Sequence, residues 1–471
     1  MRLVTLYEFQ RKYLHSLRAE GISVTPVELQ RFFDVINRTY GREGDVLSMR
    51  YDTKREDYYI QTHGSVGFTY YFGKTPFMIQ ILPKPYRNDR DQRQSMALFL
   101  SLLNLSGSLG MSTHEINSAL SRYESEDEAL HELFFYLYIL QLEKEAFHGM
   151  YQEYMEVEGE TKTIRGRLLL SKLVKNGHMQ GNVPVRYAVL GADNPLNRVL
   201  RAALEVVAEN STWRGIKRAA EHLSYNFRDV SSLGDGDMKA LRFNPLNERF
   251  KPLYTIATMI LFGFKKAGAH GTLHPGIFLD MARLFEDLVY HTVKRALRGE
   301  ATVHQWHLLP HVIKDARKVE GNLGAVFMFG RPLPDIMAVT PSGRCVIEVK
   351  YRNLLVRLGD ITRKKLVRNS SELYQIYTYS RLSGGSAAIV YPRLSGSYNE
   401  WIPDMFGEDV PSIQFFDGTR FGLFGYELSR IGKDIFVTKN GVILRENVAE
   451  NLREHLMFLC GAGKGKDHGY L

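Results

Sequence analysis

Two short apolar segments separated by a turn constrain the fold of this chain more than any other feature. Ile336–Thr340 and Cys345–Tyr351 are rich in aliphatic and β-branched residues, and the intervening Pro341-Ser-Gly-Arg344 is typical of a turn. The pattern predicts a β-hairpin. Because side chains alternate along a strand, Glu348 and Lys350 are expected on the same face of the second strand.

The charged residues at this hairpin favour phosphodiester hydrolysis. Asp335, at the start of the first strand, is expected to converge with Glu348 and Lys350. Two carboxylates can hold Mg²⁺, which lowers the pKa of a bound water and stabilises charge on the scissile phosphate. The lysine can orient that water. The alternative is an ordinary edge strand, on which a solvated Glu and Lys only oppose aggregation.

The flanking segments extend the pattern to helix, strand, strand, helix, strand. Upstream, residues 280–297 have apolar residues at helical spacing, with Glu286 at the border of the apolar stripe. Downstream, Gln375 and Tyr379 are four residues apart and share one face of a second helix, and residues 387–392 follow as a buried strand. A half-covered sheet is the expected core of this region.

This order resembles the PD-(D/E)xK nuclease superfamily over residues 275–395, and Gln375-x-x-x-Tyr379 is similar to the Q-x-x-x-Y signature of its RecB-like branch. Segments along more of the chain resemble McrC proteins. They are Ile164–Leu168, Ala192–Leu204 with its Asn197-Arg-x-Leu core, Met281–Leu288 and Glu348–Tyr351. McrC proteins usually have Asp where this chain has Glu348, and either carboxylate can bind Mg²⁺.

The resemblance implies a nuclease subunit of a modification-dependent restriction system. Asp335, Glu348 and Lys350 would be catalytic, Glu286 would be a third or water-mediated metal ligand, and Gln375 and Tyr379 would support the site. The implied cofactor is Mg²⁺, with Mn²⁺ as a substitute. The implied partners are double-stranded DNA with a modified base and an AAA+ GTPase similar to McrB, which would bind GTP and be stimulated by this chain. Two alternatives stay open: a non-catalytic assembly factor that stimulates the motor, and a stand-alone RecB-like repair nuclease.

Composition agrees with a polyanionic partner. The chain has 471 residues and a net charge of +9. A basic run follows the hairpin, where phosphate contacts would be needed, although a solvated helix face would have the same composition. Its candidate DNA-backbone residues are Arg352, Arg357, Arg363, Lys364, Lys365 and Arg368.

The remaining motifs limit other functions. Two cysteines, Cys345 and Cys460, allow no disulfide framework, and neither a signal peptide nor a bilayer-spanning run is visible, so a cytoplasmic protein is expected. There is no G-x-x-x-x-G-K-[ST] motif, which agrees with a separate motor subunit. His304, His307 and His311 are spaced three and four apart, but they are not expected to bind zinc because intervening apolar residues break a helical face.

The expected fold is a multidomain α+β or α/β protein. Residues 1–90 would form two helices, within 1–40 and with a capping box at Thr25, and then a small antiparallel β module that docks the partner or is only structural. Residues 91–265 would be mainly helical, with a long amphipathic helix from Ser125 to about Tyr154. Residues 266–460, entered through a linker at 266–275, would form the nuclease domain, a mixed sheet flanked by helices. A disordered tail, 461–471, would follow.

Overall fold

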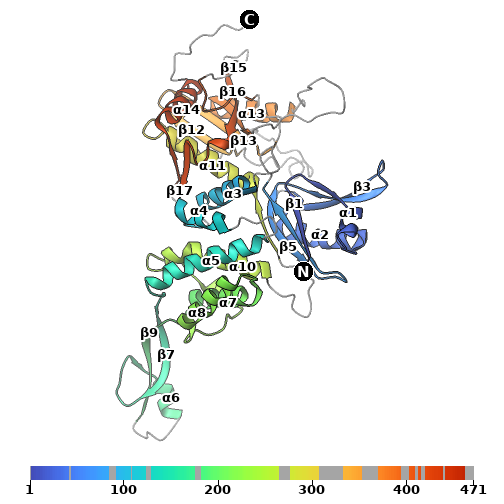
Figure 1. Ribbon diagram of the computed structural model, residues 1–471. Helices are drawn as coiled ribbons and strands as arrows, with labels where there is room; N and C mark the ends of the chain where they lie inside the picture. The colour runs from blue at the N-terminus through green and yellow to red at the C-terminus, as the bar shows by residue number, and fades with distance from the viewer. Residues whose placement is uncertain are drawn as a thin grey trace, which may run out of the picture.

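The computed structural model places a β-rich N-terminal region, a helical middle region and a C-terminal α/β region side by side (Figure 1). The residues that the structure describes are 2–41, 44–83, 92–107, 109–122, 129–175, 182–264, 276–306, 333–352, 370–393, 402–408, 412–414, 419–438 and 441–461. The expected linker, most of the basic run and residues 462–471 of the expected tail therefore lie outside the described residues.

Two sheets and two helices form the N-terminal region. The first sheet has the order β1-β6-β5-β10, with β1 parallel to β6 and the other pairs antiparallel. Its strands are β1 (Arg2–Tyr7), β6 (Phe77–Leu82), β5 (Ser65–Tyr71) and β10 (Gly276–Asp280). The second sheet contains β2 (Arg11–Tyr13), β4 (Asp57–Thr62) and β3 (Leu47–Asp52), and the helices are α1 (Leu14–Ala19) and α2 (Pro26–Tyr40).

The first forty residues contain one feature that the sequence analysis did not anticipate. The expected capping box at Thr25 is confirmed at the start of α2, where Thr25 and Glu28 exchange hydrogen bonds. The expectation of two helices alone is wrong, because β1 and β2 precede them. Val4 and Leu6 are buried on one face of β1, and this period-two pattern is the signal of a strand.

Strand β10 joins a distant part of the chain to the N-terminal sheet. It pairs antiparallel with β5, although residues 276–280 were expected in the nuclease domain. The two backbones approach so closely at Gly67 that a Cβ atom there would lie 1.8 Å from the Ile277 carbonyl oxygen. Any side chain at position 67 would therefore push β10 away.

The middle region is built around α5, which begins at Leu130 and ends at Phe147. It is buried on nearly all sides, because neighbouring helices and strand β5 pack against it. The expectation of an amphipathic helix reaching Tyr154 is therefore wrong in both pattern and length. The other helices are α3 (Gln92–Leu105), α4 (Thr113–Arg122), α7 (Pro195–Asn210), α8 (Arg214–Ser224), α9 (Asp237–Ala240) and α10 (Lys251–Phe264).

An antiparallel β arm projects from this helical region (Figure 1). Strand β7 (Glu153–Thr161) pairs along its whole length with β9 (Val183–Gly191), and β8 (Arg167–Leu168) and α6 (Leu170–Lys175) complete the arm. Most of its residues are exposed or half-buried. The expectation of a mainly helical region missed this arm, because charged residues alternate with exposed apolar residues and no buried face marks the strands.

Asp193 ties the base of the arm to a neighbouring loop. Its carboxylate accepts hydrogen bonds from Arg198 Nε at 2.7 Å, from Ser231 Oγ at 2.7 Å and from the Ser231 backbone N–H at 2.9 Å. The hydrogen bond from Arg198, followed by those from Ser231 and the charge of Arg198, holds the pKa of Asp193 well below its usual range, although burial opposes the shift.

The Asp193→Asn variant should show how much this ion pair stabilises the fold. A carboxyl group with a lowered pKa in the folded state stabilises the protein above its unfolded pKa, about 4, and this contribution is lost as pH falls through the folded value. We expect the variant to lose about 1 to 2 kcal/mol of unfolding free energy at pH 7. The difference from wild type should shrink below about pH 4. Thermal unfolding across pH measures it, and a difference that does not change with pH would contradict the assignment.

A six-stranded mixed sheet with the order β11-β12-β13-β14-β16-β15 forms the C-terminal region. Its strands are β11 (Thr302–Gln305), β12 (Ile336–Thr340), β13 (Gly343–Val349), β14 (Ser386–Arg393), β16 (Arg420–Glu427) and β15 (Ser412–Gln414). The helices are α11 (Met281–Ala296), α13 (Ser370–Ser383) and α14 (Glu446–Leu459), and a separate hairpin consists of β17 (Ile435–Thr438) and β18 (Gly441–Leu444). The expected mixed sheet with flanking helices is confirmed.

Helices cover both faces of this sheet, so the expectation of a half-covered sheet is wrong. Cys345, Ile347 and Val349 of β13 belong to the large core that also contains the apolar face of α11. Val346 belongs to a smaller core with Ile376 of α13. Residues of β13 with even numbers, Glu348 among them, therefore face α13. Both cysteines are free and buried.

Within the described parts of the chain, no helix combines the length and the apolar content needed to cross a bilayer.

Candidate functional site

The predicted hairpin is confirmed, and it brings Asp335 next to the end of β13. Ile336 pairs with Ile347, so Asp335 directly precedes the paired part of β12 and lies beside Glu348. The Oδ2 atom of Asp335 accepts a hydrogen bond of 2.7 Å from the Val349 backbone N–H. The carboxylate is therefore held by the backbone of the strand that carries the other two charged residues.

Glu348 is the buried centre of the candidate site. Only 4% of the residue is exposed. Its Oε1 atom accepts hydrogen bonds from Lys350 Nζ at 2.6 Å and from Gln375 Nε2 at 3.1 Å. The same Gln375 nitrogen lies 3.0 Å from the Tyr379 hydroxyl, so the predicted shared face of α13 is confirmed and faces this carboxylate.

The second oxygen of Glu348 is a buried acceptor without a protein donor. Within the described residues, Oε2 has no hydrogen-bond partner. Burial, followed by the negative charge of Asp335, raises the pKa of Glu348 to about 7, while the Lys350 ammonium acts in the opposite direction. Two carboxylates in a buried setting with an unused oxygen form an environment that favours a bound cation.

Lys350 and Tyr351 extend the site from the end of β13. The backbone N–H of Lys350 donates to the Val390 carbonyl at 2.9 Å, so its position is fixed between two strands. The Tyr351 ring packs against Phe285 of α11, with ring centroids 5.6 Å apart. Its hydroxyl lies 3.3 Å from Oε2 of Glu8. This contact between the site and the N-terminal region was not predicted, because no local sequence signal marks it.

The other predicted residues are placed as follows. Glu286 is half-buried on α11, and in the described residues no three His, Cys, Asp or Glu side chains gather as a possible metal site. Arg352 follows Tyr351, while the other predicted DNA-backbone residues lie outside the described residues. His304 lies on β11, and His307 and His311 also fall outside them.

The comparison with family models decides the family of the chain. The model described as McrBC 5-methylcytosine restriction system component matches residues 60–392. The chain belongs to this McrBC family. The match covers the β arm, the Asn197 segment and the hairpin with Asp335, Glu348 and Lys350, so the resemblance seen in the sequence is confirmed at the level of the family.

A solved structure also supports the fold of this McrBC-family chain. It is a refined half-complex from a tetradecameric assembly of Thermococcus gammatolerans McrB AAA+ hexamers with bound McrC. It is 22% identical, the match covers 96% of this chain and 99% of that one, and the TM-score is 0.64. A cryo-EM structure of the Thermococcus gammatolerans McrBC complex is 22% identical, with coverage of 63% and 88% and a TM-score of 0.46. A search of curated proteins found no match to this chain.

Proposed function

We propose that this McrBC-family chain is the metal-dependent DNA endonuclease subunit of a modification-dependent restriction complex. The observation that carries the proposal is the buried Glu348 carboxylate, which has one oxygen held by Lys350 and Gln375 and the other without a partner in the described residues. A purely structural Glu would be expected to have both oxygens satisfied.

The residues present fit a magnesium ion. Mg²⁺ prefers oxygen ligands and is commonly held by one or two carboxylates while it keeps several waters. Asp335 and Glu348 supply such carboxylates, and the described residues contain no cysteine or histidine cluster that would favour zinc instead. In this proposal Glu286 acts through a bound water. When bound, the metal would activate a water and offset charge on the phosphate.

Each side chain then has a distinct task. Lys350 keeps its ammonium group beside Glu348, where it can orient a water and place positive charge next to the phosphate oxygens. Gln375, steadied by Tyr379, fixes the rotamer of Glu348 from the helix side. Asp335 keeps its position through the backbone N–H of Val349. The arrangement is preorganised, because these contacts come from β13, from residues directly next to β12 and β13, and from α13.

We further propose an AAA+ GTPase as the partner. One solved structure with the same fold is described as McrB AAA+ hexamers with bound McrC. The N-terminal β module remains the proposed docking surface. The rings of Tyr51 and Tyr58, at the tip of the β3–β4 pair, pack edge to face with centroids 4.9 Å apart, and the residues are 50% and 40% exposed. Exposed aromatic residues of this kind are enriched at protein interfaces.

A reconstituted cleavage reaction tests the proposal. The purified chain is incubated in Mg²⁺ with plasmids that carry or lack a modified base, with and without the AAA+ partner and GTP. We expect cleavage only when the partner, GTP and the modified base are all present. Cleavage by the chain alone would replace the proposal with a stand-alone repair nuclease. Stimulated GTP turnover without cleavage in Mg²⁺ or Mn²⁺ would replace it with a non-catalytic assembly factor.

A further inference from the structure

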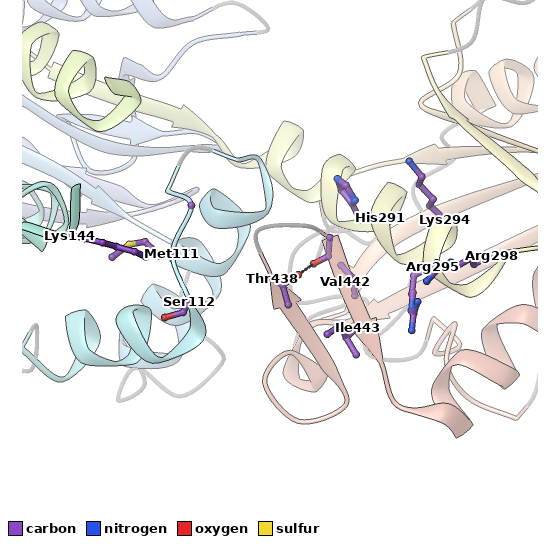
Figure 2. A pocket seen from close by; sticks show the side chains of 12 residues that line it. Met111, Ser112, Lys144, His291, Lys294, Arg295, Arg298, Thr438, Val442 and Ile443 are labelled. Atoms are coloured by element: carbon purple, nitrogen blue, oxygen red, sulfur yellow. Dashed lines mark hydrogen bonds between the residues drawn. The ribbon is translucent and has the colours of Figure 1, made fainter. Parts of the chain in front are cut away.

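A basic groove lies along the C-terminal half of α11, beyond Glu286. It is a hollow of about 890 Å³ between α11, the β17–β18 hairpin, the start of α4 and Lys144 of α5. Figure 2 shows the α11 side chains on one side of the hairpin and Met111, Ser112 and Lys144 on the other. The basic groove is defined here by Lys144, His291, Lys294, Arg295 and Arg298.

The positive charge of the groove is mostly uncompensated. Among the described residues that line it, none is Asp or Glu. Lys144 lies 3.2 Å from Glu115, but within the described chain Lys294, Arg295 and Arg298 form no ion pair. Lys294, Arg295 and Arg298 carry like charges and line the same hollow, so they repel one another. An anion bound in the groove would remove this repulsion.

The helix dipole accounts for only part of the pattern. Cations near the end of a helix are favoured by its dipole, and Lys294 and Arg295 occupy the last turn of α11. Arg298 lies beyond the end of the helix, however, and Lys144 comes from α5. The convergence of these four cations on one hollow therefore needs a separate explanation.

The lining is suited to phosphate groups rather than to bases. Arginine side chains can bind phosphate through two parallel hydrogen bonds. The lining residues that the structure describes include no Phe, Tyr or Trp, so they offer no large aromatic platform on which a base could stack. The phosphodiester backbone of DNA, which is the same for every base sequence, is the ligand that best fits this lining.

We propose that the basic groove binds the phosphodiester backbone of duplex DNA outside the catalytic site. This inference rests on the proposed function, because it takes DNA as the substrate. Glu286 and Arg295 are nine residues apart on α11, which is about 14 Å along a helix. One turn of B-DNA is about 34 Å long, so a single duplex is long enough to reach both ends of the helix.

DNA binding measured in the absence of cleavage tests the basic groove separately from the catalytic site. A fluorescent 30-base-pair duplex is titrated with the full chain in EDTA at several salt concentrations, and anisotropy gives the affinity. The groove variant is Arg295→Gln/Arg298→Gln. The matched control is Arg214→Gln/Arg218→Gln on α8, which removes the same charge from two exposed arginines without ion pairs in the described residues.

We expect the groove variant to bind about 10-fold more weakly or worse near 0.1 M salt, and the slope of log K against log salt to fall by about 1.8 for two lost phosphate contacts. The control should match wild type. Wild-type affinity and slope in the groove variant would overturn the proposal, as would an equal loss in the control. Calorimetry with tripolyphosphate forms a further arm, and groove-dependent tripolyphosphate binding with unchanged DNA binding would assign the groove to a free polyphosphate instead.

The two proposals can fail separately. If the Asp335→Asn variant and wild type both fail to cleave in Mg²⁺ while binding still depends on the groove, the nuclease proposal fails and the groove stands. If the groove variant cleaves and binds like wild type, the groove proposal fails and the nuclease stands.

Discussion

Replacing Lys350 with alanine is expected to lower the rate of DNA cleavage by about 100-fold or more, the usual cost of removing one group that stabilises charge in a transition state. The ammonium group lies 2.6 Å from Glu348, and its side chain is 25% exposed, so its removal leaves the core intact. Asp335→Asn should cause a similar loss, because it removes the charge while keeping an acceptor for the Val349 N–H. Cleavage rates measured with the partner and GTP test both variants.

A second lysine–glutamate pair provides the control. Lys251 on α10 lies 3.1 Å from Glu248, and both side chains are more than half exposed. Lys251→Ala should cleave at the wild-type rate, and all variants should still assemble with the partner. Wild-type cleavage by both Lys350→Ala and Asp335→Asn would remove these residues from the chemistry.

Replacing Asn197 with alanine is expected to lower the free energy of unfolding by about 2 to 4 kcal/mol, through lost buried hydrogen bonds and a small cavity. Asn197 is fully buried, and its Nδ2 atom donates to the Tyr151 carbonyl at 2.8 Å and to the Ala192 carbonyl at 2.7 Å. These carbonyls lie just before β7 and just after β9, where the β arm leaves and rejoins the helical region. Thermal unfolding should therefore show a lower midpoint, and hydrogen exchange should increase at the base of the arm.

Asn210, on the same helix, is a control that shows how much an Asn-to-Ala change alters stability through helix propensity alone. Asn210 is exposed at the end of α7, and its side chain donates only to the Val206 carbonyl, at 2.8 Å. Asn210→Ala should change stability by less than about 0.5 kcal/mol. Equal effects at the two positions would show that the buried hydrogen bonds of Asn197 do not stabilise the fold.

The parts of the candidate site that could be predicted from sequence are those set by local periodicity. Alternation along β13 placed Glu348 and Lys350 on one face, and the four-residue spacing placed Gln375 and Tyr379 on one helix face. Both rules follow from backbone geometry alone. The order of the flanking elements predicted a mixed sheet with neighbouring helices, but not the order of its strands.

The remaining features depend on contacts between distant parts of the chain. The contact of Tyr351 with Glu8 joins residues 343 positions apart, and no pattern near either residue announces it. The β7–β9 arm was not predicted for a different reason. Both of its faces are largely exposed, so no single buried face marks its strands. The missing partner of Glu348 Oε2 could be recognised only once the surrounding donors were placed.

Strand β10 connects the N-terminal sheet directly to helix α11. Asp280 is both the last residue of a strand in the N-terminal sheet and the residue that caps α11, where its side chain accepts a hydrogen bond from Ala282 N–H. Because β10 ends at Asp280 and α11 begins at Met281, no linker separates the sheet from the helix that carries Glu286 and Arg295. A tilt of the N-terminal sheet would therefore tilt α11 as well, because both elements are joined at Asp280. A protein that pulls on the N-terminal module could thus move the catalytic edge and the basic groove together, without touching either.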